Sequence, residues 1–356
     1  MSKRPQIFLE SHNINNMYTG FGHFNYWLIR SLTEINTSYD FTVYGSHKSA
    51  FRDFGDKVKF KKYYSLNRYP SFRIRKKYDL WHSLNQNTKI EPYHDLPYLI
   101  TMHDVIFLEK DPIELVNKRK LQQLKDKVER SDVIVFISEH AKRSANEFLN
   151  IPSSVPQPVI YNGNPVTARE PVIPEKVPVQ SRPFLFCLGQ FLEMKNFHSL
   201  VGMLAELKDY DLVLAGNSDK PYGEVVKQEI RKHNLEDRVF MPGKITEQDK
   251  HYYLQNCEAF LFPSLFEGFG LPPIEAKAYG KPVFLANRTS LPEIGGEFAF
   301  YWDHFEPDSM KQVFEAGMEK FQINKDLYRD NLINRAKSFS WEKTAREYLD
   351  VYKSIL

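Results

Sequence analysis

Two carboxylates flank a turn-forming segment in SLFEGFGLPPIEAKAYGKPV, residues 264–283, where Glu267 and Glu275 lie eight positions apart. The apolar run CEAFLFPS before the turn predicts a strand, and EAKAYG predicts a helix. Glycine lets the backbone between the two acids turn sharply and approach a ligand closely. Proline suits a first helical turn, because the N–H that it lacks would have no partner there. We therefore interpret residues 265–273 as a strand-to-helix turn.

This turn has the chemistry of a site for anions or hydroxyl groups. The N–H groups of Phe269, Gly270 and Leu271 would point outward at the positive end of the helix dipole. We expect Glu267 just before the turn and Glu275 in the first helical turn, so that both face one ligand. Carboxylates accept hydrogen bonds from the adjacent hydroxyls of a sugar or a ribose. The shape alone leaves open a second interpretation, a capped helix in which Glu275 only complements the dipole.

Three further loops carry residues that fit the same chemistry. TGFG, residues 19–22, precedes a predicted helix, and such loops either hold phosphate through backbone N–H groups or simply make the turn. Lys195 precedes another predicted helix, where its charge opposes the dipole unless an anion binds or water solvates it. His103 follows the predicted strand PYLITM, either at the ligand site or as a hydrogen-bonded loop histidine.

No metal site is expected. The sequence has no HExxH motif, no paired CxxC motif and only scattered histidines. The pair Asp209 and Asp211 leads into a predicted strand instead of following one, so we interpret it as a turn.

Strands and helices alternate along the chain, which predicts two α/β domains with parallel sheets covered on both faces. Ser138 is placed to cap one helix, and Thr246 with Asp249 has the spacing of a capping box at another. Eight prolines between Pro152 and Pro183 predict an extended linker. Two such domains imply a central cleft, with ligands at the carboxyl ends of the strands.

Composition agrees with a two-domain protein. At 356 residues, with 42% hydrophobic content, the chain is too long for one ordinary core. No run reaches the roughly 18–20 apolar residues of a membrane span. The first residues have no apolar signal core, and Cys187 and Cys257 lie in apolar strands, so we expect reduced core thiols in a cytoplasmic protein.

The net charge of +3 is unevenly distributed, with a basic first half and an acidic second half. Residues 57–77 contain nine Lys or Arg, no acid and several aromatic residues. We interpret this patch, including Arg73, Arg75, Lys76 and Lys77, as a surface that rests on anionic lipid and guides an acceptor. The alternative is a strand followed by a solvated loop.

Together these segments resemble the retaining glycosyltransferases of family four, which have two Rossmann-like domains in the B-type fold. FPSLFEGFGLPPIEAKAYGKPV is similar to the E-x7-E signature of that family, and NRTSLPEIGG to the segment that follows it. TMHD, ISEHAKRS, VIYNGN, CLGQFLEMKN and LVLAGN match the family pattern in order. FSWEKTAREYLDVYKSIL resembles its last helix, which crosses back to the first domain. The bacterial mannosyltransferases of polysaccharide biosynthesis are the most similar members.

The resemblance implies roles for individual residues. Glu267 would contact the hydroxyls of the donor sugar, and Glu275 those of the ribose. The N–H groups of the turn would hold sugar and phosphate. Lys195 would neutralise the diphosphate, with no cofactor or metal. The remaining implied contacts are Gly20 beside the diphosphate and His103 beside the sugar.

One departure concerns Gln190, which stands where many family members carry arginine. Glutamine cannot neutralise charge, so Lys195 would carry more of the leaving-group stabilisation. Arg288 is a candidate substitute.

The resemblance also implies the domain limits and the partners. We expect an acceptor domain over 1–165, a proline-rich linker over 166–182, a donor domain over 183–337, and a returning helix over 338–356. The expected partners are a nucleotide-sugar donor, with GDP-mannose favoured, a glycan or lipid-linked acceptor and an anionic membrane surface, but no nucleic acid. The expected location is the cytoplasm, with peripheral association at the inner face of the membrane.

Other functions remain open from the sequence. A transferase that uses a UDP-sugar would have the same signature, and a sugar-nucleotide epimerase would have the same fold without an acceptor site. A glycosidase would need carboxyls that flank one glycosidic bond. A sugar-binding module would leave Lys195 unexplained, and GFGH lacks the full dinucleotide fingerprint of a dehydrogenase.

Overall fold

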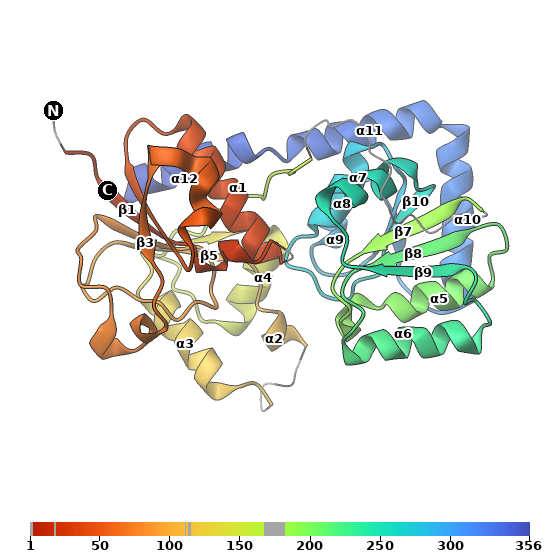
Figure 1. Cartoon of the computed structure of the whole chain (residues 1–356), viewed down its shortest axis with the longest axis horizontal. Coiled ribbons are helices and arrows are strands. Elements are labelled where there is room, and N and C mark those ends of the chain that lie inside the picture. The colour runs from red at the N-terminus through yellow and green to blue at the C-terminus, as the bar shows by residue number, and fades with distance from the viewer. Residues whose placement is uncertain (1–2, 18, 111, 113–114, 167–181) are drawn as a thin grey trace. The chain divides into compact units, whose positions relative to one another are not determined.

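A computed structural model describes residues 3–17, 19–110, 112, 115–166 and 182–356. Residues 167–181 of the predicted linker therefore lie outside the described residues. The chain divides into two compact units (Figure 1). The first unit contains residues 1–163 and 340–356, and the second contains residues 164–339.

The first unit is built on six parallel strands in the order β3-β2-β1-β4-β5-β6. This is the Rossmann order, in which the chain reverses direction across the sheet beside β1. The strands are β1 (Gln6–Glu10), β2 (Asp40–Gly45), β3 (Val58–Lys62), β4 (Leu80–Ser83), β5 (Tyr98–Met102) and β6 (Val133–Phe136). The α-helices are α1 (Gly20–Ile35), α2 (Ile106–Glu109), α3 (Lys118–Glu129), α4 (Glu139–Phe148) and α12 (Trp341–Ile355).

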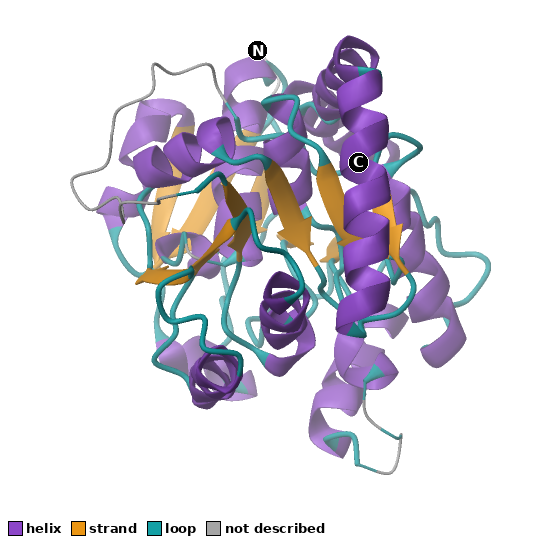
Figure 2. Ribbon diagram, turned by 90° about the vertical axis from the view of Figure 1, so that its right-hand side faces the viewer, coloured by secondary structure: helices purple, strands orange, loops and turns teal. Residues whose placement is uncertain are grey.

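The second unit repeats this topology with the order β12-β11-β10-β7-β8-β9, again parallel. Helices flank the strands on both sides (Figure 2). The strands are β7 (Phe184–Leu188), β8 (Asp211–Ala215), β9 (Val239–Gly243), β10 (Ala259–Phe262), β11 (Val283–Ala286) and β12 (Phe300–Trp302). The helices are α5 (Phe197–Ala205), α6 (Pro221–Lys232), α7 (Glu247–Asn256), α8 (Leu271–Ala278), α9 (Leu291–Gly295), α10 (Pro307–Ile323) and α11 (Lys325–Ser338).

Local signals in the sequence explain several helix starts. The Ser138 hydroxyl accepts a hydrogen bond from the N–H of Ala141 at 3.0 Å, which caps α4 as predicted. Thr246 and Asp249 form both bonds of the predicted capping box at α7, with Asp249 in place of the usual glutamate. Cys187 and Cys257 are buried free thiols, as expected.

Helix α12 closes the core of the first unit, although 176 residues of the second unit precede it in the chain. It packs along α1 (Figure 1). The hydroxyl of Tyr352 is 2.8 Å from Nδ1 of His82, and the hydroxyl of Tyr348 is 2.8 Å from Oγ1 of Thr101. These four side chains are fully buried, so the last helix is an integral part of the first unit.

Candidate functional site

The turn between β10 and α8 has the shape that its glycines predict. Gly270 is the residue before α8 and has φ +106°, a conformation that L side chains rarely adopt. A Cβ atom at Gly270 would also lie 2.9 Å from the Leu291 side chain. Pro272 falls in the first turn of α8, where the missing N–H costs nothing. The chain is therefore turned sharply just before the helix N-terminus.

A second loop holds this turn in place. The Ser290 hydroxyl donates to the carbonyl oxygens of Glu267 and Phe269, at 2.9 and 2.8 Å. The N–H of Glu267 donates to Oγ1 of Thr289 at 3.1 Å, and Thr289 itself has φ +52°. Neither supporting residue was predicted from the sequence, although both lie in the NRTSLPEIGG segment that carries the resemblance. Their hydrogen bonds fix the backbone on either side of Glu267.

The structure brings together two of the predicted site residues, because the Lys195 ammonium forms an ion pair with the Glu267 carboxylate. Lys195 ends a short 3₁₀ turn after β7, and Asn196, which has a left-handed backbone conformation, is the residue before α5. Each side chain of the pair is 14% exposed. The ammonium also lies 5.5 Å from the centre of the Phe262 ring. A partly shielded cation thus faces the first acid of the signature.

Glu275 lies differently from our expectation. Because α8 begins at Leu271, Glu275 is in the second turn of the helix, and the prediction that it occupies the first turn is wrong. Its side chain is buried and accepts a hydrogen bond from Lys250 of α7 at 2.6 Å. Lys250 is also 2.8 Å from Glu247. Burial opposes the charge of Lys250, but these two carboxylates outweigh it and raise the pKa of the lysine.

Lys250 is a residue that sequence reasoning missed. It lies inside a helix whose pattern indicated only a capping box, and nothing in its spacing pointed to Glu275. A partner 25 residues away on another helix becomes visible only when α7 and α8 are packed together.

Gln190 and Arg288 lie in two loops of the second unit, after β7 and after β11. Gln190 is half-buried just after β7, and its backbone carbonyl oxygen accepts a hydrogen bond from the N–H of Leu192 at 2.8 Å. Arg288 is exposed, and its guanidinium donates to the carbonyl oxygens of Asn287 and Asp303 at 3.3 and 3.0 Å. Neither of these two hydrogen bonds of Arg288 involves Lys195.

His103 in the first unit is held as a neutral, oriented imidazole. Its Nε2 is 2.9 Å from the carbonyl oxygen of Leu84, which can only accept, so Nε2 carries the proton. The rings of Phe21 and Phe24 pack against the imidazole in edge-to-face contacts. Their centroids lie 4.8 and 4.6 Å from that of His103. Burial lowers the pKa of His103 to about 4. Its Nδ1 is therefore a hydrogen-bond acceptor at neutral pH.

The glycines of the TGFG loop have different roles. A Cβ atom at Gly22 would lie 2.0 Å from the carbonyl oxygen of Asn16, so the fold itself requires this glycine. Gly20 is the first residue of α1, and a Cβ atom there would meet no atom of the described residues within 4 Å, its two chain neighbours aside. The loop packing thus leaves open space at Gly20, beside a helix start that Thr19 caps.

The basic segment 57–77 is largely exposed. Arg75, Lys76 and Lys77 are exposed, and Arg73 is half-buried. Large side chains that the core would normally bury also face solvent in this segment: Tyr64, Leu66, Tyr69 and Phe72 are 47–58% exposed. Cations lie over several rings, as Lys62 does over Tyr64 at 5.6 Å. The segment therefore presents mixed basic and aromatic surface.

The described part of the chain contains neither a cluster of metal ligands nor a membrane-spanning helix. Among the residues that the structure describes, no three His, Cys, Asp or Glu side chains gather where they could hold a metal ion. No helix in the same ranges has the length and apolar character needed to cross a membrane.

Comparisons with known proteins agree with this geometry. Residues 169–339 match the family described as glycosyl transferases group 1. O-antigen chain mannosyltransferase B of Escherichia coli is 25% identical over 312 residues, which cover 85% of this chain and 76% of that protein. Serotype-specific mannosyltransferase WbdA of Escherichia coli is 31% identical over 244 residues, or 64% of this chain. The match spans only 29% of the length of WbdA.

Solved structures share the fold over nearly the whole chain. Sucrose-phosphate synthase from Thermosynechococcus elongatus has a TM-score of 0.76 at 17% identity, with 99% of both chains covered. Anabaena HepE in complex with UDP and glucose has a TM-score of 0.72 at 15% identity, with 99% of this chain and 100% of HepE covered. Residues 169–339 are therefore similar to the group 1 glycosyl transferases, and the chain has the two-domain α/β fold of B-type glycosyltransferases.

Proposed function

We propose that this protein is a retaining, metal-independent glycosyltransferase that moves mannose from GDP-mannose to a glycan or lipid-linked acceptor in cell-surface polysaccharide synthesis. The observation that carries the proposal is the ion pair of Lys195 with Glu267 beside the glycine turn before α8. The names of the two Escherichia coli relatives, both mannosyltransferases, favour mannose as the sugar.

The charge that develops in the reaction gives each second-unit residue a role. Cleavage of the bond between sugar and phosphate leaves negative charge on a diphosphate and positive character on the anomeric carbon. The Lys195 ammonium and the N-terminus of α8 stabilise the diphosphate. Glu267 accepts hydrogen bonds from sugar hydroxyls, and it holds the ammonium in position before the donor arrives. Glu275 binds the ribose hydroxyls, and Lys250 holds its side chain in position.

No metal is needed in this mechanism, because lysine and backbone N–H groups take the place of a divalent cation at the diphosphate. We therefore expect turnover to continue in EDTA. Loss of turnover in EDTA, with recovery in magnesium or manganese, would contradict this part of the proposal.

The first unit binds the acceptor in this proposal. His103 is neutral at physiological pH, so it serves as a hydrogen-bond partner of a sugar hydroxyl through Nδ1 and not as a cation. The exposed basic and aromatic segment 57–77 rests on anionic lipid and holds the protein at the inner face of the membrane.

A panel of nucleotides and sugar nucleotides tests the proposal through the melting temperature. A ligand at about 100 times its dissociation constant adds roughly 2.7 kcal/mol to the free energy of unfolding. We expect GDP and GDP-mannose to raise the melting temperature more than UDP, UDP-glucose or UDP-N-acetylglucosamine do. A larger shift with the UDP series would replace mannose transfer by transfer from a UDP-sugar. No shift with any nucleotide would overturn the proposal.

A further inference from the structure

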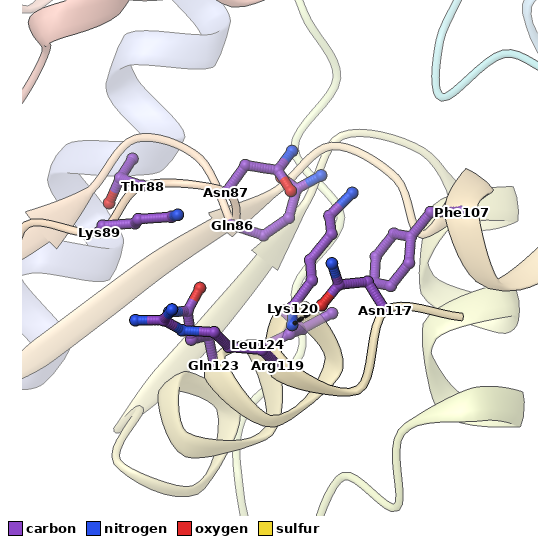
Figure 3. A pocket seen from close by; sticks show the side chains of 10 residues that line it. All are labelled: Gln86, Asn87, Thr88, Lys89, Phe107, Asn117, Arg119, Lys120, Gln123 and Leu124. Carbon is purple, nitrogen blue, oxygen red and sulfur yellow. Dashed lines mark hydrogen bonds between the residues drawn. The ribbon is translucent and has the colours of Figure 1, made fainter. Parts of the chain in front are cut away.

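A cavity of about 340 Å³ lies wholly within the first unit, between residues 86–89 after β4 and the first turns of α3 (Figure 3). Ten of the residues that the structure describes line it, and none of these ten carries a carboxylate. The donor-site residues Lys195, Glu267 and Glu275 all belong to the second unit. The cavity is therefore a separate feature that the proposed donor chemistry does not use.

The charge of the lining is positive. Lys89, Arg119 and Lys120 contribute three cationic side chains. Arg119 and Lys120 belong to the first turn of α3, which contains no acidic residue. Cations at the positive end of a helix dipole destabilise the helix, and a bound anion removes that conflict. Asp104 acts on Lys120 from outside the lining and offsets only part of this charge.

The rest of the lining suits a sugar ring. Four side-chain amides, each able to donate and accept, face the cavity: Gln86, Asn87, Asn117 and Gln123. The ring of Phe107 forms an apolar wall, and the Lys120 ammonium lies 3.8 Å from the centre of that ring. A hexose presents hydroxyls at its edge and C–H groups on its faces, so amides and an aromatic ring complement both.

Buried contacts hold the two walls together. Lys127 of α3 donates to Oγ1 of Thr88 at 3.0 Å and is 2.8 Å from Oε1 of Glu91. Lys127 is 4% exposed, and the charge of Glu91 and the Tyr98 side chain outweigh the effect of burial and raise its pKa. These contacts hold α3 against the segment after β4 before any ligand arrives, which lowers the cost of binding.

One lining residue connects the cavity to His103. The Gln86 side chain accepts from the backbone N–H of His103 at 3.1 Å and donates to the carbonyl oxygen of Asp104 at 2.8 Å. Gln86 is 4% exposed. A ligand that contacts Gln86 would therefore lie beside the loop that carries the predicted sugar-contacting histidine.

We propose that this cavity binds an anionic saccharide, a hexose that bears a phosphate or a carboxylate, and that it is the site for the charged part of the acceptor. This assignment rests on the proposed transferase function. Beyond the transferase function, the assignment specifies that the acceptor carries a negative charge. This charge lies near the acceptor sugar that the first unit binds.

Three probes with one ring test the charge requirement: glucose, glucuronic acid and glucose 6-phosphate, which differ only at carbon six. Titration calorimetry at low salt, with the donor site filled by whichever of GDP and UDP binds, measures each affinity. We expect at least one of the two anionic probes to bind about tenfold or more tightly than glucose. Preference for glucose 6-phosphate would assign a phosphate and preference for glucuronic acid a carboxylate, and both support the proposal. Equal or undetectable binding of all three would overturn it.

Two double variants, each lacking two positive charges, show where on the protein the probe binds. Arg119→Gln with Lys120→Gln removes two charges from the cavity, and Lys118→Gln with Lys125→Gln removes two exposed charges of the same helix outside the lining. The first variant should bind the preferred probe about tenfold more weakly, and the second should stay within about twofold of the native protein. Equal losses in both variants would mean that binding is general attraction to a basic helix, and the cavity assignment would fail.

Nucleotide affinity separates this proposal from the transferase proposal. Both variants should bind GDP or UDP as the native protein does, because the changed residues lie in the first unit. If nucleotide binds and no anionic probe does, the cavity proposal fails and the transferase proposal stands. If anionic probes bind and no nucleotide does, the cavity is a saccharide site in a protein that is not a sugar-nucleotide transferase.

Discussion

At the scale of single residues, the structure places the two acids of the signature in different surroundings. Glu267 is paired with Lys195 at a partly exposed position, whereas Glu275 is buried against Lys250. A partly exposed pair can rearrange around a ligand at little cost. A buried pair is part of the folded structure, and removal of one member leaves an uncompensated charge.

We expect Lys195→Ala and Glu267→Ala each to lower turnover by at least roughly 100-fold, the effect of removing one electrostatic stabiliser of a transition state. Steady-state release of nucleoside diphosphate from the donor measures this. Lys227→Ala is a suitable control, because Lys227 forms an ion pair with Glu224 on an exposed helix of the same unit. If turnover fell by less than tenfold in both Lys195→Ala and Glu267→Ala, the ion pair would have no role in catalysis.

Glu275→Ala should weaken nucleotide binding and also reduce the free energy of unfolding by about 3 kcal/mol, near the lower end for breaking a buried ion pair. The smaller value is expected because Glu247 remains as a partner of Lys250. Denaturant titration and nucleotide titration measure the two effects separately.

The double variant Lys250→Met with Glu275→Gln distinguishes the two roles of Glu275. It removes both buried charges, so stability should return to within about 1 kcal/mol of the native protein. Nucleotide affinity should remain low, because the carboxylate that binds ribose is still absent. Recovery of both stability and affinity would assign Glu275 to folding alone.

The sequence indicated the turn before α8 more completely than it indicated the residues that support this turn. Gly270 and the prolines carry local signals of a turn before a helix, and Glu267 follows from its place in that turn. Lys250, Thr289 and Ser290 carry no such signal, because their contacts form only when distant segments pack together.

At the scale of secondary-structure elements, the alternation of strands and helices was sufficient to predict both sheets. The predicted strands PYLITM and CEAFLFPS contain β5 (Tyr98–Met102) and β10 (Ala259–Phe262), since each is an apolar run bounded by turn residues. β12 and the helices α9 to α11 were not predicted. β12 has only three residues, and its Phe300 and Tyr301 are only partly buried, so it lacks a distinctive apolar run. Helix α11 has buried positions only at Leu332 and Ala336.

Helix α12 brings a pH-dependent contact into the first unit. Burial, with a smaller contribution from His103, lowers the pKa of His82 to about 3, and burial lowers that of His103 to about 4. Both histidines are neutral in the folded protein. The unfolded chain takes up their protons first, from its ordinary pKa of 6.5 downward.

We therefore expect the free energy of unfolding of the first unit to fall as the pH is lowered below about 6.5, by up to about 1.4 kcal/mol per pH unit for each histidine. Denaturant titrations between about pH 7 and pH 5 measure the slope. His82→Gln removes one titrating group and should reduce the slope by about half. An unchanged slope in this variant would show that other groups cause the acid sensitivity.

At the scale of the whole molecule, the surface of the first unit differs from that of an ordinary monomer in segment 57–77. Basic side chains alternate there with exposed rings, and each basic residue near an anionic leaflet contributes about 1 kcal/mol. Aromatic side chains favour the membrane interface. These properties fit a protein that works beside a lipid-linked acceptor.

We expect the protein to sediment with anionic vesicles more than with neutral ones, and less as salt is added. Charge reversal at four patch residues should abolish this binding and leave donor affinity unchanged. These residues are Arg73, Arg75, Lys76 and Lys77.

A control variant carries the same number of charge reversals at exposed lysines outside the patch. These residues are Lys320, Lys325, Lys337 and Lys343. The control should retain vesicle binding. Equal and negligible binding of the native protein to both vesicle types would indicate a soluble acceptor.

The most direct test of the central claim is the transfer of radiolabelled mannose from GDP-mannose to a membrane or lipid extract of the source cells, in the presence of EDTA. We predict labelled product with the mannose in the α configuration of the donor, stoichiometric release of GDP, and loss of both with Lys195→Ala. Release of no GDP under any condition, or equal transfer by the native protein and Lys195→Ala, would contradict the assignment of this protein as a metal-independent mannosyltransferase that acts through Lys195.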